Sequence, residues 1–291
     1  MVWVGYGYAA LLLATTAVLF ALAWALYRRR PLPASTTNIA LLGLAGIWSL
    51  GYAMELVSVG LAAKALWAKF QFFGIAFLPT AWFLYALQYV GLLRRPSPRL
   101  LGALAVLPLA ALALAWTNEF HGLIWSQARV TELDGQTLLS QKYGLGLWVY
   151  VAYAYTLVGI GTVALMRRLL GTSPFFRRQI GSLLFMGLTP LLGSVIDLSL
   201  LHAQVQFDLT PLAFALSATA AGWNLLRYQF GVILPVAHES IVLGMRDGVL
   251  VLDEQQRVVE INPRAQRLIG LGDREAIGRP LAEMWDQAEP V

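Results

Sequence analysis

Long runs of apolar residues, separated by short polar or proline-containing breaks, constrain this chain more than any other feature. A helix needs about 20 apolar residues to cross the ~30 Å hydrocarbon core of a bilayer. Seven runs reach this length and predict membrane spans at residues 3–27, 36–60, 66–91, 99–117, 146–166, 179–201 and 210–230. Only 13% of the residues are charged, against about 25% in a globular domain, which excludes a soluble protein of this size.

The charged residues predict how the spans are oriented. Residues 1–235 hold 15 basic and 6 acidic side chains, a net charge of +9, and a seven-span topology places 11 of the basic ones on one side. That side receives Arg28, Arg29, Arg30, Arg94, Arg95, Arg99, Arg167, Arg168, Arg177, Arg178 and Arg227. The six acidic residues fall on the other side, together with Lys64, Lys69, Arg129 and Lys142. Because arginine-rich loops stay in the cytoplasm, the N-terminus is predicted outside and the C-terminus inside.

The longest loop between spans runs from about Asn118 to Leu145 and is predicted to lie outside. Its residues 131–137 indicate a short β-hairpin around Asp134 and Gly135. The loop is long enough to fold over the mouth of the helix bundle.

The composition changes after Pro235, because residues 236–291 hold 6 basic and 10 acidic side chains, a net charge of −4. Residues 247–253 and 257–262 have the pattern of two short strands. Asn262-Pro263 then predicts the start of a helix that ends at Gly270, since proline suits a first helical turn and glycine an end. This order, in the run DGVLVLD…RVVEINPRAQRLIG, is similar to the opening half of a PAS domain. We expect the PAS domain to be truncated in this chain, so that its ligand pocket cannot close.

The membrane part resembles the seven-transmembrane N-terminal sensor region of bacterial histidine kinases. Three stretches carry the resemblance: LWAKFQFFGIAFLPTAWFLYALQYVG in the third span, NEFHGLIW after the fourth, and DLTPLAFALSATAAGWNLLRYQFGVILPVAHESIVLGMRDGVLVLD from the seventh span into the tail. The expected fold is an all-α membrane protein, a seven-transmembrane helix bundle with a C-terminal α+β PAS segment. The expected domains are a sensor over residues 1–232, a juxtamembrane signalling helix over 233–246 and the PAS part over 247–291.

What the resemblance implies is a sensory input module in the bacterial cytoplasmic (inner) membrane. A ligand or membrane signal would pass through the seventh span, by way of Asn224, Arg227 and Pro235, to the PAS part and to output domains. The sequence has no ATP-binding motif and no conventional phospho-acceptor box, so no catalytic residue is expected in this chain. The expected partners are an unknown small-molecule or lipid ligand, membrane lipids, a second copy in a homodimer, and downstream kinase or response-regulator machinery, but no nucleic acid.

Ionisable residues near membrane depth are the candidates for a ligand site, because burying them costs about 3 kcal/mol or more unless they are paired. We predict an outward pocket lined by Glu55, Glu119, His121, Trp125, Asp197, His202 and Asp208. A simpler interpretation is that each acid lies at the interface, hydrated or paired with a lysine.

No metal or cofactor is predicted. The chain has no cysteine, which excludes thiolate metal sites and disulfides, and the histidines lack metal-ligand spacing. A retinal pigment needs a lysine inside the bundle, whereas Lys64, Lys69 and Lys142 are all expected at the outer face. Two other functions stay open: a cation-coupled transporter or channel with a regulatory tail, and a membrane adaptor that recruits a separate kinase.

Overall fold

The computed structural model describes residues 2–28, 35–93, 95–133, 136–170, 180–181, 183–185, 187–189, 193, 208, 210–213, 215–219, 247–252, 256–272, 276 and 278–282. Within this part, five apolar helices are long enough to cross a membrane: Gly5–Arg28, Thr36–Val57, Leu61–Tyr89, Pro98–Trp116 and Leu145–Leu170. They correspond to the first five predicted spans. The sixth and seventh predicted spans lie largely outside the described residues, which include a shorter apolar helix at Thr210–Thr219.

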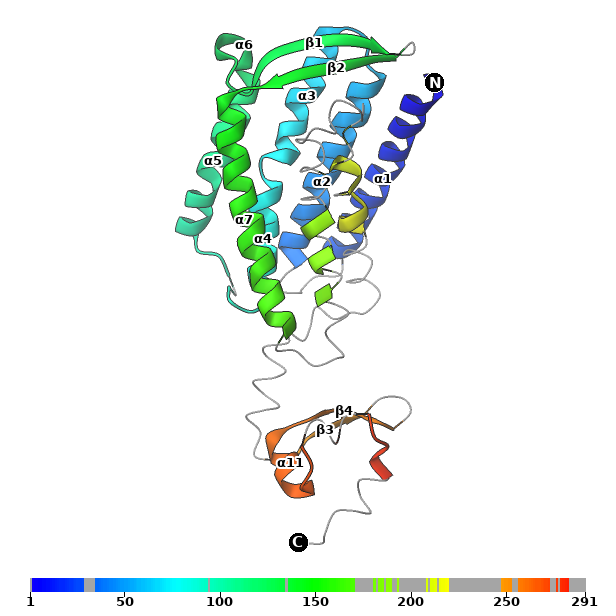
Figure 1. Ribbon diagram of the computed structural model, residues 1–291, viewed down its shortest axis with the longest axis vertical. Coiled ribbons are helices and arrows are strands. Elements are labelled where there is room, and N and C mark those ends of the chain that lie inside the picture. Colours follow the sequence, from blue (N-terminus) through cyan, green and yellow to red (C-terminus); the bar gives the residue numbers. More distant parts are fainter. Residues whose placement is uncertain are drawn as a thin grey trace.

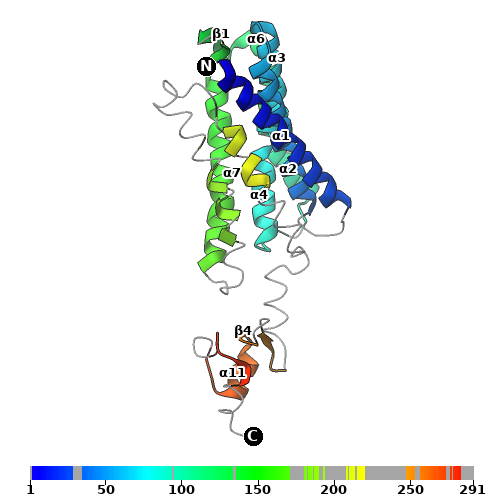
Figure 2. The same cartoon turned by 90° about the vertical axis from the view of Figure 1, so that its right-hand side faces the viewer.

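The elements of the bundle follow the chain as α1 (Val2–Arg28), α2 (Ser35–Val57), α3 (Leu61–Ile75), α4 (Leu78–Tyr89), α5 (Pro98–Trp116), α6 (Asn118–His121), β1 (Trp125–Leu133), β2 (Gln136–Tyr143) and α7 (Leu145–Leu170). Helices α1, α2 and α3 pack in chain order, and α4 packs mainly against α7 (Figures 1 and 2). Helix α5 lies at the periphery, against α3 and α7. The largest buried core joins α1, α2, α4 and α7.

The third predicted span begins earlier than expected and is not one continuous helix. It starts at Leu61, so Lys64 lies inside α3 and not in the preceding loop, which corrects the sequence prediction. Pro79 stands in the first turn of α4. Because proline has no backbone N–H, it cannot donate the hydrogen bond to Ile75 that a continuous helix would contain. The span is interrupted at Ala76 and Phe77, between the two helices.

Helix α3 approaches the backbone of α2 closely at Gly74. A Cβ atom added there would lie 2.5 Å from the carbonyl oxygen of Leu44 and 2.9 Å from the backbone nitrogen of Trp48. Backbone atoms inside a helix cannot move aside as a flexible side chain can. Glycine at this position therefore permits the packing of α2 on α3, which is the usual role of small residues between membrane helices.

We expect Gly74→Ala to lower the free energy of unfolding by about 1–3 kcal/mol, the usual cost of overpacking. Gly159→Ala in α7 is the matched control, because a Cβ atom there would meet no atom within 4 Å. Thermal unfolding of the two variants in the same detergent checks the prediction. Equal stability of Gly74→Ala and the parent would contradict the close approach of α2 and α3.

One end of the bundle, which we call the hairpin end, is covered by the antiparallel strands β1 and β2 (Figure 1). The pairing runs from Trp125 opposite Tyr143 to Leu133 opposite Gln136, with an irregularity near Trp125. The hairpin was predicted, and it is longer than the predicted segment. Its tip, Asp134-Gly135, lies outside the described residues.

The opposite end carries most of the positive charge, and we call it the arginine end. The helix ends and the loop between α4 and α5 place on this side Arg28, Arg95, Arg99, Arg167 and Arg168. The acidic residues in the described part of the bundle lie at the hairpin end, and they are Glu55, Glu119, Glu132 and Asp208. The predicted orientation rests on this asymmetry and stays a prediction.

The C-terminal segment has the secondary structure predicted for it. Strand β3 (Leu250–Leu252) pairs antiparallel with β4 (Val258–Ile261), and helix α11 (Pro263–Ile269) follows. The buried side chain of Asn262 caps α11 by accepting a hydrogen bond of 2.8 Å from a backbone N–H in its first turn. Gly270 ends the helix with a φ of 77°, a conformation that favours glycine.

Candidate functional site

Six polar residues meet at the hairpin end, where four segments of the chain come together. We call this group the clamp cluster, and its members are Tyr8 from α1, Tyr52 and Glu55 from α2, Lys64 and Gln71 from α3, and Asp208. Residues three or seven positions apart share one face of a helix. This spacing brings Tyr52 with Glu55, and Lys64 with Gln71, to the same side of their helices.

Asp208 is tied to α1 and α2 through its backbone. The hydroxyl of Tyr8 donates a hydrogen bond of 2.8 Å to the carbonyl oxygen of Asp208, and the N–H of Asp208 donates one of 2.8 Å to the hydroxyl of Tyr52. The carboxylate of Asp208 accepts a hydrogen bond of 2.8 Å from the N–H of Thr210, so it caps the helix Thr210–Thr219. The start of that helix is thus attached to the first two helices of the bundle.

Glu55 joins α2 to α3. Its side chain is buried, and its carboxylate accepts a hydrogen bond of 2.6 Å from the amide nitrogen of Gln71. The fully buried ammonium group of Lys64 donates a hydrogen bond of 2.8 Å to the backbone carbonyl oxygen of Glu55. Gly51, one turn earlier in α2, leaves the space that the Gln71 side chain occupies.

The clamp cluster brings two carboxyl groups and one ammonium group into largely apolar surroundings. Tyr52, which shares a helix face with Glu55, is hydrogen-bonded to Asp208, so the like charges of the two carboxyl groups repel each other, and the ammonium group of Lys64 lies at the backbone of Glu55. Charges interact more strongly in such surroundings than in water. A proton or a cation bound here would relieve the repulsion, so the geometry can respond to a positively charged signal.

Glu119 and His121 belong to a different group, in the short helix α6. Glu119 forms an ion pair with Lys69 of α3, and its side chain is 61% exposed. Both ring nitrogens of His121 make hydrogen bonds within the same short segment, to Thr117 and to the N–H of Leu123. The ion pair attaches α6 to α3, and the bonds of His121 hold the short segment itself together.

Trp125 anchors the hairpin. Its ring is buried and packs edge to face on Phe72 of α3, with 5.4 Å between ring centroids. The side chain of Asn118 holds the start of β1, because it accepts hydrogen bonds from the N–H groups of Ile124 and Trp125 and donates one to the carbonyl oxygen of Trp125. In this structure Trp125 is a packing residue.

The ion pair between Lys69 and Glu119 predicts a dependence on pH. The hydrogen bond from Lys69 holds the pKa of Glu119 below its ordinary value, which is about 4.3. A carboxyl group of this kind stabilises the fold above its ordinary pKa, and the contribution is lost as the pH falls through the lowered pKa. Because Glu119 is exposed, we expect less than about 1 kcal/mol from the pair at neutral pH.

We therefore expect Lys69→Met to raise the pKa of Glu119 toward its ordinary value, as followed by NMR titration of the glutamate carboxyl carbons. Lys142→Met, on β2, should leave this pKa unchanged. A pKa that does not move in Lys69→Met would show that the ion pair does not form in the membrane.

The predicted pocket divides in the structure. Of the residues assigned to it, Glu55 and Asp208 share the clamp cluster, whereas Glu119, His121 and Trp125 belong to α6 and the base of the hairpin. The structure thus places these five residues in two groups, and their role in binding a ligand stays a prediction. Two others, Asp197 and His202, lie outside the described residues, as do the predicted relay residues Asn224, Arg227 and Pro235.

The sequence analysis missed Tyr8, Tyr52 and Gln71. Nothing in the sequence pairs Tyr8 with a residue 200 positions away. Tyr52 and Gln71 could have been found from their spacing, since each shares a helix face with a charged residue, Glu55 or Lys64.

Among the described residues, no group of three or more histidine, aspartate or glutamate side chains is placed to hold a metal ion. The two carboxyl groups of the clamp cluster stand with tyrosine, lysine and glutamine, not with further acidic ligands.

Comparisons with known proteins give two matches. The model of a family described as the N-terminal 7TM region of histidine kinase matches residues 11–235. The model of a family described as a PAS fold matches residues 244–291. The comparison with curated proteins finds no match. The two matches confirm both resemblances that the sequence carries.

Proposed function

Because the chain belongs to the family described as the N-terminal 7TM region of histidine kinase, we propose that it is the sensory input module of a two-component signalling protein, with the clamp cluster as its input. The family and the apolar helices make it a multi-pass membrane protein. A PAS fold follows the membrane part. A membrane sensor region followed by a PAS fold suits a protein that passes a signal along its chain.

One observation carries the proposal. Asp208 lies at the start of the last described helix before the PAS segment, and its backbone is hydrogen-bonded to Tyr8 and Tyr52. Its carboxylate caps the same helix, and the buried carboxylate of Glu55 belongs to the same cluster. A change of charge in the clamp cluster therefore acts directly on the helix that leads toward the PAS segment.

The proposed mechanism is a change between two packings of the bundle. A signal can shift such an equilibrium only by stabilising one packing more than the other. With Glu55 and Asp208 both charged, repulsion favours a packing in which the helix Thr210–Thr219 is less closely held. A proton or a cation between them favours the packing seen here, and the difference passes along the chain toward Asn224, Arg227 and Pro235.

The remaining features of the proposal follow from the family and the charge distribution. We propose the hairpin end outside and the arginine end inside, in a bacterial inner membrane. The module would be a homodimer without catalytic activity of its own, over the domains 1–232, 233–246 and 247–291, and it would act on kinase or response-regulator machinery. A transporter is less well supported, because in the described part of the bundle the acidic residues do not continue past the hairpin end.

Asp208→Asn tests the role of the charge. Asparagine is as good a helix cap as aspartate, so this variant removes the charge and keeps the hydrogen bond to Thr210. We expect altered hydrogen–deuterium exchange in nanodiscs in two places, the helix Thr210–Thr219 and the strands β3 and β4. Lowering the pH should change the exchange of the parent in the same segments and have less effect on the variant.

Glu132→Gln, on the exposed part of β1, is the control and should exchange like the parent. If the changes in exchange were confined to residues 208–219, with β3 and β4 unaffected at every pH, the proposed transmission of the signal to the PAS segment would be contradicted. Sodium or proton flux in liposomes that is lost in Asp208→Asn would favour the transporter instead.

A further inference from the structure

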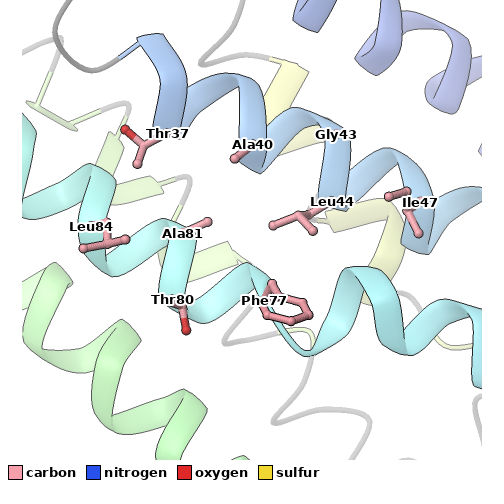
Figure 3. Close-up of a pocket in the computed structure, with 9 residues that line it drawn as sticks. All are labelled: Thr37, Ala40, Gly43, Leu44, Ile47, Phe77, Thr80, Ala81 and Leu84. Carbon is pink, nitrogen blue, oxygen red and sulfur yellow. The ribbon is translucent and has the colours of Figure 1, made fainter. Parts of the chain in front are cut away.

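An apolar groove runs between α2 and α4, away from the clamp cluster (Figure 3). Its volume of about 450 Å³ is within the range of about 300–1,000 Å³ that ligand sites occupy. One face of each helix and the residue before α4 line it, namely Thr37, Ala40, Gly43, Leu44 and Ile47 of α2, Phe77, and Thr80, Ala81 and Leu84 of α4. The break between α3 and α4 lies at Phe77, at one end of the groove.

The groove offers an occupant only apolar contacts. The hydroxyl groups of Thr37 and Thr80 are already used, because Thr37 donates a hydrogen bond to Gln88 and Thr80 is hydrogen-bonded at 2.9 Å to Tyr153. No charged side chain is among the described residues that line the groove. An apolar chain would fit this lining, whereas a polar ligand would lose its hydrogen bonds.

The groove lies beside the core and shares its α4 wall with it, because Ala81 lines the groove and belongs to the core, and Thr80 and Leu84 are buried as well. The α2 wall is more open. Ala40, in the wall of the groove, is exposed. Both helices lie within membrane-length spans, so an acyl chain of the bilayer can reach the exposed α2 wall of the groove.

The charge at one end of the groove selects among lipids. Thr37 stands in the first turns of α2 and Leu84 in the last turns of α4, so this end of the groove is the arginine end of the bundle. Arg95 and Arg99 follow α4 at the same end, and both are exposed. In the described part of the bundle, the acidic residues are at the opposite end. A phosphate group would therefore meet attraction and no repulsion from these residues.

We propose that the groove binds an anionic phospholipid, with an acyl chain between α2 and α4 and the phosphate group at Arg95 and Arg99. Basic clusters beside membrane helices attract anionic lipids in this way. The site is separate from the clamp cluster and does not depend on the proposed function. It gives the bundle a second contact with its surroundings, through the lipid composition of one leaflet.

Delipidated protein in neutral detergent, titrated with phosphatidylglycerol, phosphatidylcholine or palmitate, tests the proposal by native mass spectrometry and thermal shift. Phosphatidylglycerol should bind most tightly. Ala40→Trp should weaken its binding about tenfold. The indole ring would fill part of the groove and leave about two methylene groups of the acyl chain unburied. Arg95→Gln with Arg99→Gln should weaken it about 25-fold, about fivefold for each arginine, and leave phosphatidylcholine unaffected.

Matched controls are Ala21→Trp, on the exposed face of α1 at a similar distance from the arginine end, and Arg129→Gln at the hairpin end. Both should bind phosphatidylglycerol like the parent. Equal binding of phosphatidylglycerol and phosphatidylcholine would overturn the proposal, as would tighter binding of palmitate. It would also be overturned if Ala40→Trp kept full lipid binding and lost only self-association, which would assign the groove to a second copy of the chain.

Discussion

A polar group that enters a membrane-spanning bundle must find its partner within the protein, because the hydrocarbon offers none. This constraint accounts for the helices, whose backbone groups are satisfied internally, and for the clamp cluster. Glu55 and Lys64 are buried near the hairpin end, and each has a hydrogen-bond partner on another helix. The contacts that satisfy them tie α2 to α3, while the tyrosines tie Asp208 to α1 and α2.

The same constraint separates the two ends of the molecule. At the hairpin end, polar contacts connect segments far apart in the chain, and α6 and the hairpin pack over the helices. At the arginine end, the described charged side chains are arginines. In the proposed orientation, a signal at the clamp cluster and a lipid at the arginine end would act on different parts of one bundle.

The sequence predicted the features that depend on local patterns. The first five spans, the hairpin, the strands of the PAS segment and the helix capped by Asn262 all follow from hydropathy, alternation and capping residues close in the chain. The clamp cluster could not be predicted in this way. The hydrogen bond between Tyr8 and Asp208 joins residues 200 positions apart, and the helix that buries Lys64 starts before the apolar run does.

The attachment of Asp208 to Tyr8 and Tyr52 is tested most directly by a distance measurement. The chain has no cysteine, so spin labels can be placed at Leu13→Cys and Leu216→Cys, both exposed, and their separation measured in nanodiscs. The account predicts a narrow distribution in the parent and a broader, longer one when Tyr8→Phe and Tyr52→Phe are combined. An identical distribution in the double variant would contradict it, because the helix Thr210–Thr219 would then be held without the tyrosines.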